Sequence, residues 1–312
     1  MAEPIKVAYV FPGQGAQGVG MGRDLYQNFD SAKAVFDQAD EALGFHLSKL
    51  CFEGPEDELL QTINAQPAIV TVSFACLEAS RNAGNGLPAA GFVAGHSLGE
   101  YTALAAAGVL DFATTVYLAR ERGRLMHEAG QIIPGGMAAI IGLDESVLTE
   151  VCAETGAGIA NINCPGQIVI SGAEGNLTQA MDLAKAKGAH RVIRLQVSGA
   201  FHTPLMQPAV DGMAEIIATL SFNQPTIPII GNTTAQPLTT VESIKEELLR
   251  QLCNCVEWQR SVEYMVNDGV STLIELGPGR VLAGLIKRID RNVNILNIGD
   301  AEAIRNITAG QE

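Results

Sequence analysis

Short apolar runs alternate along the chain with longer stretches in which apolar residues recur every three to four positions. This pattern is typical of buried strands that alternate with amphipathic helices. The run at Lys6–Phe11 ends at Pro12-Gly13 and predicts a strand, and a second run at 90–95 passes directly into an alanine-rich helix at 98–107. Further strands are expected at 226–230 and 272–276, and further helices at 28–43, 57–63, 67–83 and 112–127. Strand, abrupt turn and helix in this order indicate an α/β fold with a parallel sheet.

The middle of the chain has the pattern of a separate unit. Residues 130–136 contain glycine and proline and predict a flexible link. Strands and helices then follow in the order βαββαβ, at residues 137–141, 145–154, 159–163, 167–171, 176–187 and 191–197. A ferredoxin-like subdomain has this order, and roughly 65 residues suffice to form it. We therefore expect an inserted ferredoxin-like subdomain at 130–198, with residues 1–129 and 199–312 forming the main domain.

The composition is that of a globular chain with an acidic surface. Of 312 residues, 47% are hydrophobic and 17% are charged, which excludes a disordered or fibrous chain. The net charge of −14 repels phosphate backbones and argues against a nucleic-acid partner. The apolar runs are far shorter than the ~20 residues of a membrane-spanning helix, so no membrane association is expected either.

The amino terminus and the cysteines bear on the location of the protein. No charged region with an apolar run and a cleavage site precedes the first strand, so we expect no secretion signal. The six cysteines contain no C-x-x-C pair, and we expect reduced thiols with no zinc or other metal site. Both observations predict a cytoplasmic protein.

A glycine-rich loop, Gly13-Gln-Gly-Ala-Gln-Gly18, follows the first strand. Its G-x-G-x-x-G spacing matches the dinucleotide-binding fingerprint. The segment after the loop has a helical pattern, however, and no second strand ends in an acidic residue ~20 positions further on. A tight turn therefore explains the glycines better, and a nucleotide-binding module is kept only as an alternative.

The main chemical signal is Gly95-His-Ser-Leu-Gly99, which fits G-x-S-x-G between a predicted strand and a predicted helix. In that context the two glycines permit a sharp turn that exposes the Ser97 hydroxyl. The first amides of the helix, Leu98 among them, point at the same place and favour developing negative charge. The motif predicts a serine nucleophile beside an oxyanion hole, on an α/β-hydrolase-like main domain. A tight turn without chemistry is the plainer interpretation of the same glycines.

A serine nucleophile needs a base, because its hydroxyl is un-ionised near neutrality. Three of the five histidines lie among polar residues at helix ends or in loops: His46, His127 and His190. His96 adjoins the serine and is expected to point away across the turn. His202 lies in a loop between the inserted unit and the main domain, where an imidazole can be held over a cleft. His202 is therefore the candidate base, although a lone histidine is more often structural.

The arginines of the predicted helix at 112–127 differ in their surroundings. Residues three and four positions from Arg124 are polar, so Arg124 belongs to a solvated face. Arg122 has leucine, alanine and methionine at these positions, which places its charge on the face that should be buried. Burial of an unpaired charge is costly, so Arg122 either pairs with an internal acid or binds an anionic ligand. A guanidinium presents two parallel donors, which suit a carboxylate.

Several motifs that follow one another along the chain give it a clear resemblance. They are Phe11-Pro-Gly-Gln-Gly15, Gly95-His-Ser-Leu-Gly-Glu100, Glu121-Arg-Gly123, Ala200-Phe-His202, Tyr264-Met265 and Glu275-Leu-Gly-Pro-Gly279. Together they resemble the malonyl-CoA:acyl carrier protein transacylase family over nearly the whole chain. Separate motifs at compatible spacing are far more specific than any one of them alone.

The resemblance implies a role for each of the candidate residues. Ser97 would be the nucleophile, His202 the base and Arg122 the residue that binds the malonyl carboxylate. The backbone amides of Gln14 and Leu98 would form the oxyanion hole. This gives the glycine-rich loop a task unrelated to nucleotides, namely close approach of the backbone.

Two further residues follow from the resemblance alone. In this family a backbone carbonyl orients the base, and the matching position is Gln251. Three acidic residues are kept as alternative orienters: Glu275, Asp211 and Glu100. Phe201 resembles the version of its motif associated with malonyl rather than methylmalonyl substrates, because a bulky ring leaves little room for an α-methyl group. Cys253 and Cys255 lie where relatives vary and have no assigned role.

The implied function is ping-pong transfer of a malonyl group from malonyl-CoA, through malonyl-serine, to the phosphopantetheine thiol of acyl carrier protein, in fatty acid synthesis. No cofactor is implied, because malonyl-CoA is a substrate and the phosphopantetheine is carried by the partner. One alternative is the same transfer for polyketide assembly. Another is a serine thioesterase or esterase, which would carry an acid–histidine pair and would need no buried arginine.

The carrier protein of this pathway is acidic, so it would need local positive charge on an acidic chain. Candidate residues lie on the inserted unit and near the carboxyl terminus: Lys185, Lys187, Arg191, Arg194, Arg280, Lys287, Arg288 and Arg291. A solvated face without a partner is the more common origin of such charges. We expect the protein itself to be a monomer.

Overall fold

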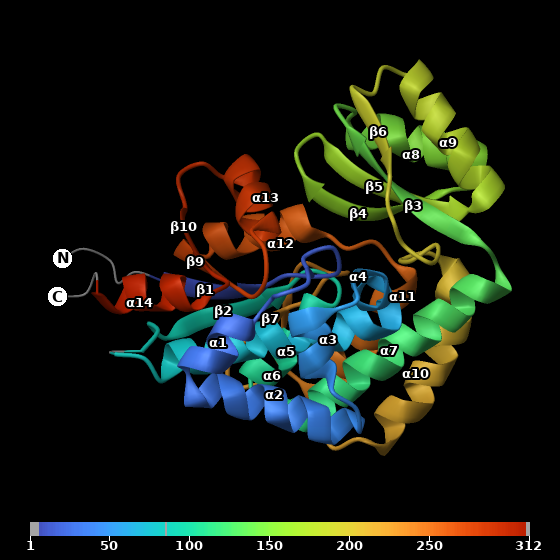
Figure 1. The fold of residues 1–312 in the computed structure, drawn as a ribbon. Helices are drawn as coiled ribbons and strands as arrows, with labels where there is room; N and C mark the ends of the chain where they lie inside the picture. The colour runs from blue at the N-terminus through green and yellow to red at the C-terminus, as the bar shows by residue number, and fades with distance from the viewer. Residues whose placement is uncertain (1–5, 85, 310–312) are drawn as a thin grey trace.

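Two β-sheets form the framework of this computed structural model, which describes residues 6–84 and 86–309. The chain forms two strands of the larger sheet, crosses into the smaller sheet and then returns to complete the larger one (Figure 1). The larger sheet is mainly parallel and the smaller one is antiparallel. This arrangement confirms the predicted α/β class.

Parallel pairing dominates the larger sheet. In sheet order its strands are β10 (Asn294–Ile298), β9 (Val270–Leu276), β1 (Lys6–Phe11), β2 (Ala90–Gly95), β7 (Ile229–Ile230) and β8 (Pro237–Leu238). Neighbouring strands run parallel except for β7 and β8. In the β1–β2 register Phe11 lies beside Gly95, so the glycine-rich loop and the serine turn leave the sheet side by side at its carboxyl edge.

Helices cover both faces of this sheet, because side chains on a strand alternate between its faces. The helices are α1 (Arg23–Asn28), α2 (Asp30–Leu43), α3 (Leu47–Glu53), α4 (Glu56–Leu60), α5 (Thr62–Arg81), α6 (Gly99–Ala106), α7 (Phe112–Ile132), α10 (Gln207–Thr219), α11 (Val241–Cys253), α12 (Trp258–Asn267), α13 (Val281–Ile289) and α14 (Ala301–Ala309), with a 3₁₀ turn at Pro204–Met206. Val7, Tyr9 and Phe11 pack in one apolar cluster with α2, α5, α6 and α7. Ala8 and Val10 pack in a second cluster with α12 and α13.

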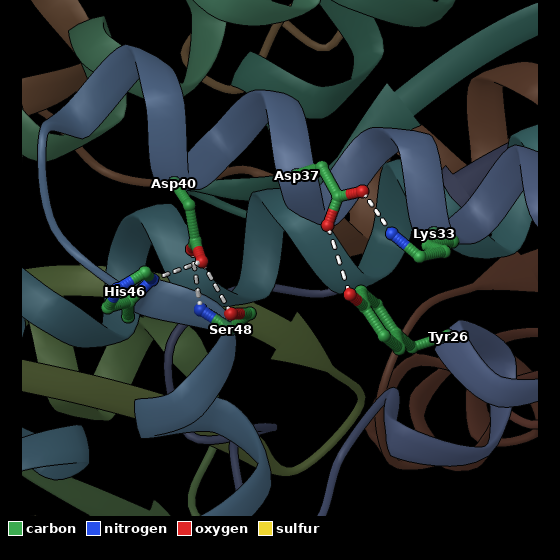
Figure 2. A network of polar contacts seen from close by, with 6 residues as sticks. All are labelled: Tyr26, Lys33, Asp37, Asp40, His46 and Ser48. Carbon is green, nitrogen blue, oxygen red and sulfur yellow. Dashed lines mark hydrogen bonds and ion pairs between the residues drawn. The ribbon is translucent and has the colours of Figure 1, made fainter.

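Polar side chains of α2 hold its two neighbours (Figure 2). Asp37 accepts a hydrogen bond from the Tyr26 hydroxyl of α1 at 3.1 Å. Asp40 accepts bonds from the amide and hydroxyl of Ser48, at the start of α3, at 2.8 Å and 2.6 Å. His46 Nδ1 lies 3.2 Å from the same carboxylate. His46 therefore belongs to a structural polar network, as its polar surroundings in the sequence predicted.

The smaller sheet has helices on one face and a cleft on the other. Its strands, in sheet order, are β4 (Gly158–Cys164), β5 (Gln167–Ala173), β3 (Gly135–Ile141) and β6 (Arg191–Arg194), and its helices are α8 (Glu145–Thr155) and α9 (Glu174–Ala186). Ala138, Ile140 and Ile170 pack against these two helices. Met137 and Val169 alternate with them and therefore face the larger sheet.

The predicted flexible link at residues 130–136 was wrong. α7 continues to Ile132 and β3 begins at Gly135, so the two sheets are joined by a helix that runs almost into a strand. The glycine at position 130 has a packing reason, because a Cβ there would lie 2.4 Å from the Ser198 carbonyl oxygen. Close contact with the returning chain, and not flexibility, accounts for this residue.

Two predicted strands are shorter than expected. The strand at 226–230 is reduced to two residues, and the strand at 191–197 ends at Arg194. The domain limits before residue 130 and after residue 198 stay a prediction. Within residues 6–84 and 86–309, no helix is long and apolar enough to cross a membrane.

Candidate active site

A cleft of about 190 Å³ lies between the carboxyl edge of the larger sheet and the free face of the smaller one. Its floor is formed by the loop after β1 and the turn after β2, and its roof by side chains such as Met137, Asn161 and Val169. Five of the seven predicted site residues line it: Gln14, Ser97, Arg122, Phe201 and His202. The fold therefore brings together residues that lie far apart in the sequence.

Ser97 lies at the turn between β2 and α6, with a φ of 50°. This left-handed backbone conformation is uncommon for a residue with a side chain. The glycines on either side are required by close packing. A Cβ added at Gly95 would lie 1.9 Å from the Gly99 carbonyl carbon, and one added at Gly99 would lie 2.1 Å from the Phe11 carbonyl oxygen. The turn holds the serine at the N-terminal end of α6, where the helix dipole favours negative charge.

Ser97 and His202 are in direct contact. Ser97 Oγ lies 2.8 Å from His202 Nε2, and His202 Nδ1 lies 2.7 Å from the Gln251 carbonyl oxygen. A carbonyl can only accept a hydrogen bond, so Nδ1 carries the proton and Nε2 is left to accept from the serine hydroxyl. Burial and the nearby Arg122 charge lower the pKa of His202 to about 3, so the ring is neutral near pH 7.

Arg122 is 1% exposed and reaches the serine from α7. Its Nη2 donates to Ser97 Oγ at 3.1 Å and to Gln251 Oε1 at 2.6 Å. Its Nη1 donates to Gln66 Oε1 at 2.9 Å. Within the described residues Arg122 forms no ion pair with a carboxylate, and its Nε has no hydrogen-bond partner. Neutral groups therefore hold a guanidinium whose charge is unmatched.

Gln251 connects these groups from α11. Its Nε2 donates to Glu100 Oε2 at 2.8 Å and to the Ser97 carbonyl at 2.9 Å, while its Oε1 faces Arg122. Burial, with the nearby Glu247 carboxylate, raises the pKa of Glu100 well above its usual range. Glu100 accepts its hydrogen bond from Gln251, and among the described residues it forms no direct ion pair with the arginine.

The three acids considered as orienters of the histidine are engaged elsewhere. Glu100 contacts the Gln251 side chain, as described above. Glu275 accepts from two backbone amides at the start of α13, at 3.0 Å and 2.9 Å. Asp211 accepts from Gln207 at 2.8 Å. In the part of the chain that the structure describes, the ring nitrogen behind the base meets the Gln251 carbonyl and no carboxylate.

Two backbone amides near the serine have no partner among the described residues. The amides of Gln14 and Leu98 make no hydrogen bond to any described residue. The loop that carries Gln14 packs closely on the serine turn, because a Cβ added at Gly13 would lie 2.3 Å from the His96 carbonyl oxygen. Free amides beside a serine hydroxyl are the donors that an oxyanion requires.

The expectation that His96 points away from the site was wrong. His96 lines the cleft, and its Nε2 lies 2.8 Å from Asn163 Oδ1 of β4, while its ring packs edge-on to Trp258. The smaller sheet supplies this polar partner over the turn, which no local pattern could show. On the other side of the cleft, Phe201 is 4% exposed and lies next to His202 in the chain.

Three polar residues that hold the site were missed: Gln66, Asn232 and Glu247. Asn232 follows the carboxyl end of β7, the edge at which sites gather in parallel sheets, and this position is a usable signal. Gln66 and Glu247 lie within helices and have no such signal, because their partners come from other elements.

Fold and site together define a class of protein. The chain is an α/β protein with a serine at a strand-to-helix turn, a neutral histidine on its hydroxyl and two free amides beside it. These are the parts of an enzyme that forms an acyl-serine. Beside that hydroxyl lies the buried guanidinium of Arg122, a group whose parallel donors suit an anionic ligand.

Comparison with known proteins identifies the family. The family described as acyl transferase domain matches residues 8–304. A malonyl CoA-acyl carrier protein transacylase of Bacillus subtilis is 45% identical over 304 residues, which cover 96% of this chain and 95% of that protein. The protein of the same name from Escherichia coli is 44% identical over 286 residues, which cover 90% of this chain and 92% of that protein.

Solved structures of similar proteins match the fold of this chain over nearly its whole length. The acyl-carrier-protein-S-malonyltransferase from Bartonella henselae has a TM-score of 0.94 at 41% identity, covering 98% of this chain and 99% of that one. A malonyl-transacylase solved in complex with its type II PKS acyl-carrier protein has a TM-score of 0.93 at 38% identity, with 98% and 99% covered. The chain belongs to the malonyl-CoA:acyl carrier protein transacylases of the acyl transferase family, and it is an acyltransferase.

Proposed function

We propose that this chain moves a malonyl group from malonyl-CoA to the phosphopantetheine thiol of an acyl carrier protein, through a malonyl ester of Ser97. The observation that carries the proposal is the buried, unmatched charge of Arg122 beside the serine hydroxyl. A malonyl group ends in a carboxylate, so it supplies the missing charge while its thioester reaches the serine. Fatty acid synthesis is the proposed destination. Polyketide assembly is the second candidate, because one similar structure is a type II PKS pair.

In the first half-reaction Ser97 attacks the thioester carbonyl of malonyl-CoA. His202 Nε2 accepts the hydroxyl proton, and the Gln251 carbonyl holds the ring in place and stabilises its positive charge. The amides of Gln14 and Leu98 donate to the oxyanion. The carbon–sulfur bond then breaks, His202 returns the proton to the departing CoA thiolate, and malonyl-Ser97 is left.

In the second half-reaction the carrier-protein thiol enters the same cleft. His202 accepts the thiol proton, the sulfur attacks the ester carbonyl, and the proton passes to Ser97 Oγ as the carbon–oxygen bond breaks. One thioester is exchanged for another at nearly equal free energy, so the concentrations set the direction. We propose no cofactor, because the nucleophile, the base and the two amides supply every step.

A serine thioesterase would share the nucleophile but would release the acyl group to water. The backbone carbonyl behind His202 and the buried Arg122 support the transferase. The lifetime of the malonyl-enzyme in buffer without an acceptor separates the two functions, since a transferase keeps the ester and a thioesterase loses it within one turnover. The close packing of the loop at Gly13 on the serine turn argues against the nucleotide-binding alternative.

We also propose finer descriptions of the fold and its setting. The element order βαββαβ and the sheet order β4-β5-β3-β6 support a ferredoxin-like subdomain at 130–198. The serine turn supports an α/β-hydrolase-like main domain formed by residues 1–129 and 199–312. The protein is proposed to be a cytoplasmic monomer. Its six free thiols support a reducing compartment.

The carrier protein is proposed to dock at the mouth of the cleft. Several of the basic residues considered for docking are engaged by neighbours: Lys185, Lys187, Arg194, Lys287 and Arg288. Arg191, Arg280 and Arg291 are exposed, and among the described residues no side-chain hydrogen bond or ion pair engages them; Arg191 and Arg280 lie on elements that enclose the cleft. Arg280 directly precedes Val281, a cleft-lining residue that is 52% exposed. These two arginines support docking of an acidic partner.

Mass spectrometry of the intact protein after mixing with malonyl-CoA tests the proposed function. We expect one malonyl adduct on the wild type and none on Ser97→Ala. Acetyl-CoA at the same concentration is the control for substrate class, and peptide mapping locates the adduct. The proposal fails if the wild type takes up no malonyl group, or if Ser97→Ala still carries one.

A further inference from the structure

Asn232 lies directly behind the nucleophile and bonds to both sides of its turn. The side chain comes from the loop after β7, and the residue is 2% exposed. Its Oδ1 accepts a hydrogen bond from the Ser97 amide at 2.6 Å, and its Nδ2 donates to the Gly95 carbonyl at 2.7 Å. One carboxamide thus bridges the residue before the turn and the residue at its apex.

This bridge acts on a strained conformation. Ser97 has a φ of 50°, which a residue with a Cβ adopts only when its surroundings enforce it. Without the bridge, the Ser97 amide loses its acceptor and the turn is free to relax toward a negative φ. Relaxation would rotate the hydroxyl away from His202 Nε2, which lies only 2.8 Å from it.

The bridge also determines which backbone amide of the serine turn has an acceptor. The Ser97 amide donates to Asn232, whereas the amide of the next residue, Leu98, has no partner among the described residues. An oxyanion hole needs donors at fixed positions. A turn that rotates would misplace the Leu98 amide together with the hydroxyl.

The segment that carries Asn232 is held by α11 and by the residue before α12. The amide and hydroxyl of Thr233, the next residue, both donate to the Glu247 carboxylate at 2.6 Å. The Asn232 carbonyl accepts from the Glu257 amide at 2.7 Å. Glu247 lies one helical turn before Gln251, whose carbonyl holds the base. A single helix therefore fixes the nucleophile through Asn232 and the base through Gln251.

We propose that Asn232 is a positioning residue that locks the Ser97 turn in its reactive conformation. The inference rests on the proposed function, because it assigns Asn232 a role in loading of the serine. Asn232 touches neither substrate nor reacting atoms, and it acts through the backbone on both sides of the nucleophile. Its loss should slow malonyl loading without weakening malonyl-CoA binding.

The variant Asn232→Asp tests this role with little change of shape. A carboxylate still accepts from the Ser97 amide, but it cannot donate and it repels the Gly95 carbonyl. A protonated carboxyl has one donor and one acceptor and restores both bonds. Burial beside Glu247 raises the pKa of the introduced acid, so the protonated form gains population as the pH falls from about 8 to about 5.5.

The measurement is single-turnover loading, followed by rapid quench and intact mass spectrometry, at a series of malonyl-CoA concentrations. At pH 8 we expect the maximal loading rate of Asn232→Asp to fall about 100-fold relative to the wild type, with the half-saturating concentration changed less than about twofold. The ratio of variant to wild-type rate should rise about tenfold or more toward pH 5.5. A purely structural role predicts no such recovery.

Thr226→Val is the matched control, because the Thr226 hydroxyl donates to the Ala107 carbonyl at 2.9 Å in a remote, partly buried bond. We expect this control to lower the melting temperature but not the loading rate. Asn232→Ala is a second test variant, and if it does not fold, the near-isosteric Asn232→Asp decides. A wild-type-like loading rate in Asn232→Asp, or a rate ratio that does not change with pH, overturns the inference. Failure of the wild type to load malonyl at all overturns the proposed function instead.

Discussion

At the scale of single residues, the unmatched charge of Arg122 should decide which acyl group is accepted. An acetyl group leaves the buried guanidinium unpaired, whereas a malonyl group gives it a carboxylate. In Arg122→Ala we expect kcat/KM for malonyl-CoA to fall by about two orders of magnitude or more, and the ratio of acetyl to malonyl transfer to rise. Steady-state kinetics with acetyl-, malonyl- and methylmalonyl-CoA measure both quantities.

The control for this prediction is Arg124→Ala on the same helix. Arg124 forms ion pairs with Glu121 and Glu128 on the exposed face, so its removal should leave the acyl preference unchanged. An unchanged malonyl-to-acetyl ratio in Arg122→Ala would show that the buried arginine is only structural. Methylmalonyl-CoA tests Phe201 in the same assay, since the ring is expected to exclude an α-methyl group.

The environment of His202 predicts the pH dependence of loading. Burial and the Arg122 charge lower its pKa to about 3, and a general base works only when it is unprotonated. We therefore expect kcat/KM for malonyl loading to stay level as the pH falls from about 8 to about 5, where a histidine of ordinary pKa, about 6.5, would already be protonated. An acid limb centred near pH 6.5 would contradict the buried, neutral ring.

The same shift predicts a cost in stability at low pH. Below about pH 6.5 a histidine in the unfolded chain binds a proton, whereas His202 in the folded protein stays unprotonated. The stability contributed by neutral His202 is therefore complete above about pH 6.5 and is lost as the pH falls toward about 3. Urea unfolding at pH 7 and pH 5 should show a larger loss for the wild type than for His202→Gln. Equal losses in the two proteins would place the acid sensitivity elsewhere.

Residues whose evidence is local could be predicted from the sequence. The serine turn has its own motif, and the periodicity of one helix singled out Arg122. Gln66 and Asn232 could not be predicted in this way, because they bond to residues 56 and 135 positions away in the chain. Only the resemblance to a family pointed to Gln251, whose carbonyl contacts a histidine 49 positions away.

At the scale of elements, the turn between β7 and β8 stores backbone strain next to the site. Ala235 has a φ of 52° and is buried in this turn. A left-handed conformation costs a residue with a Cβ about 1–2 kcal/mol, and glycine avoids most of that cost although it loses more entropy on folding. We expect Ala235→Gly to raise the free energy of unfolding by up to about 1 kcal/mol, measured by urea denaturation.

The carboxyl end of α2 supplies the reverse change as a control. Gly44 has a φ of 71°, and a Cβ added there would meet nothing within 4 Å. Gly44→Ala should therefore lower the free energy of unfolding by about 1 kcal/mol through the backbone alone. A stability change of the same sign in both variants would show that backbone strain does not govern these turns.

Elements could be predicted where their own residues determine them. β1 has a continuous apolar run because helices cover both faces of its sheet, and the run marked the strand correctly. β7 has only two residues, and it is a strand because it pairs with Val93 and Ala94 of β2. The apolar pattern of its own segment does not contain this partner, so the strand predicted from that pattern was too long. The glycine at position 130 led to the wrong prediction of a flexible link for a similar reason. It is required by close contact with residue 198, which is far away in the sequence.

At the scale of the whole molecule, charge bears on how the chain meets its proposed partner. The chain carries a net charge of −14, which repels an acidic carrier protein at long range. The proposed docking would therefore depend on local positive charge near the mouth of the cleft. Arg280 precedes the first residue of α13, beside a cleft-lining valine, and Arg191 begins β6 of the smaller sheet. The two arginines therefore lie on the two parts of the structure that enclose the cleft.

Charge reversal at these positions should weaken transfer to carrier protein and spare transfer to a small acceptor. In the double variant Arg191→Glu, Arg280→Glu we expect kcat/KM for carrier protein to fall about tenfold, because electrostatic attraction acts mainly on association, while kcat/KM for free pantetheine stays within about twofold. Lys49→Glu, on α3 away from the cleft, changes the net charge in the same direction and should have little effect. Salt should slow wild-type transfer to carrier protein more than it slows transfer in the double variant, since it screens the same attraction. Equal losses with both acceptors would assign these arginines to an ordinary solvated surface.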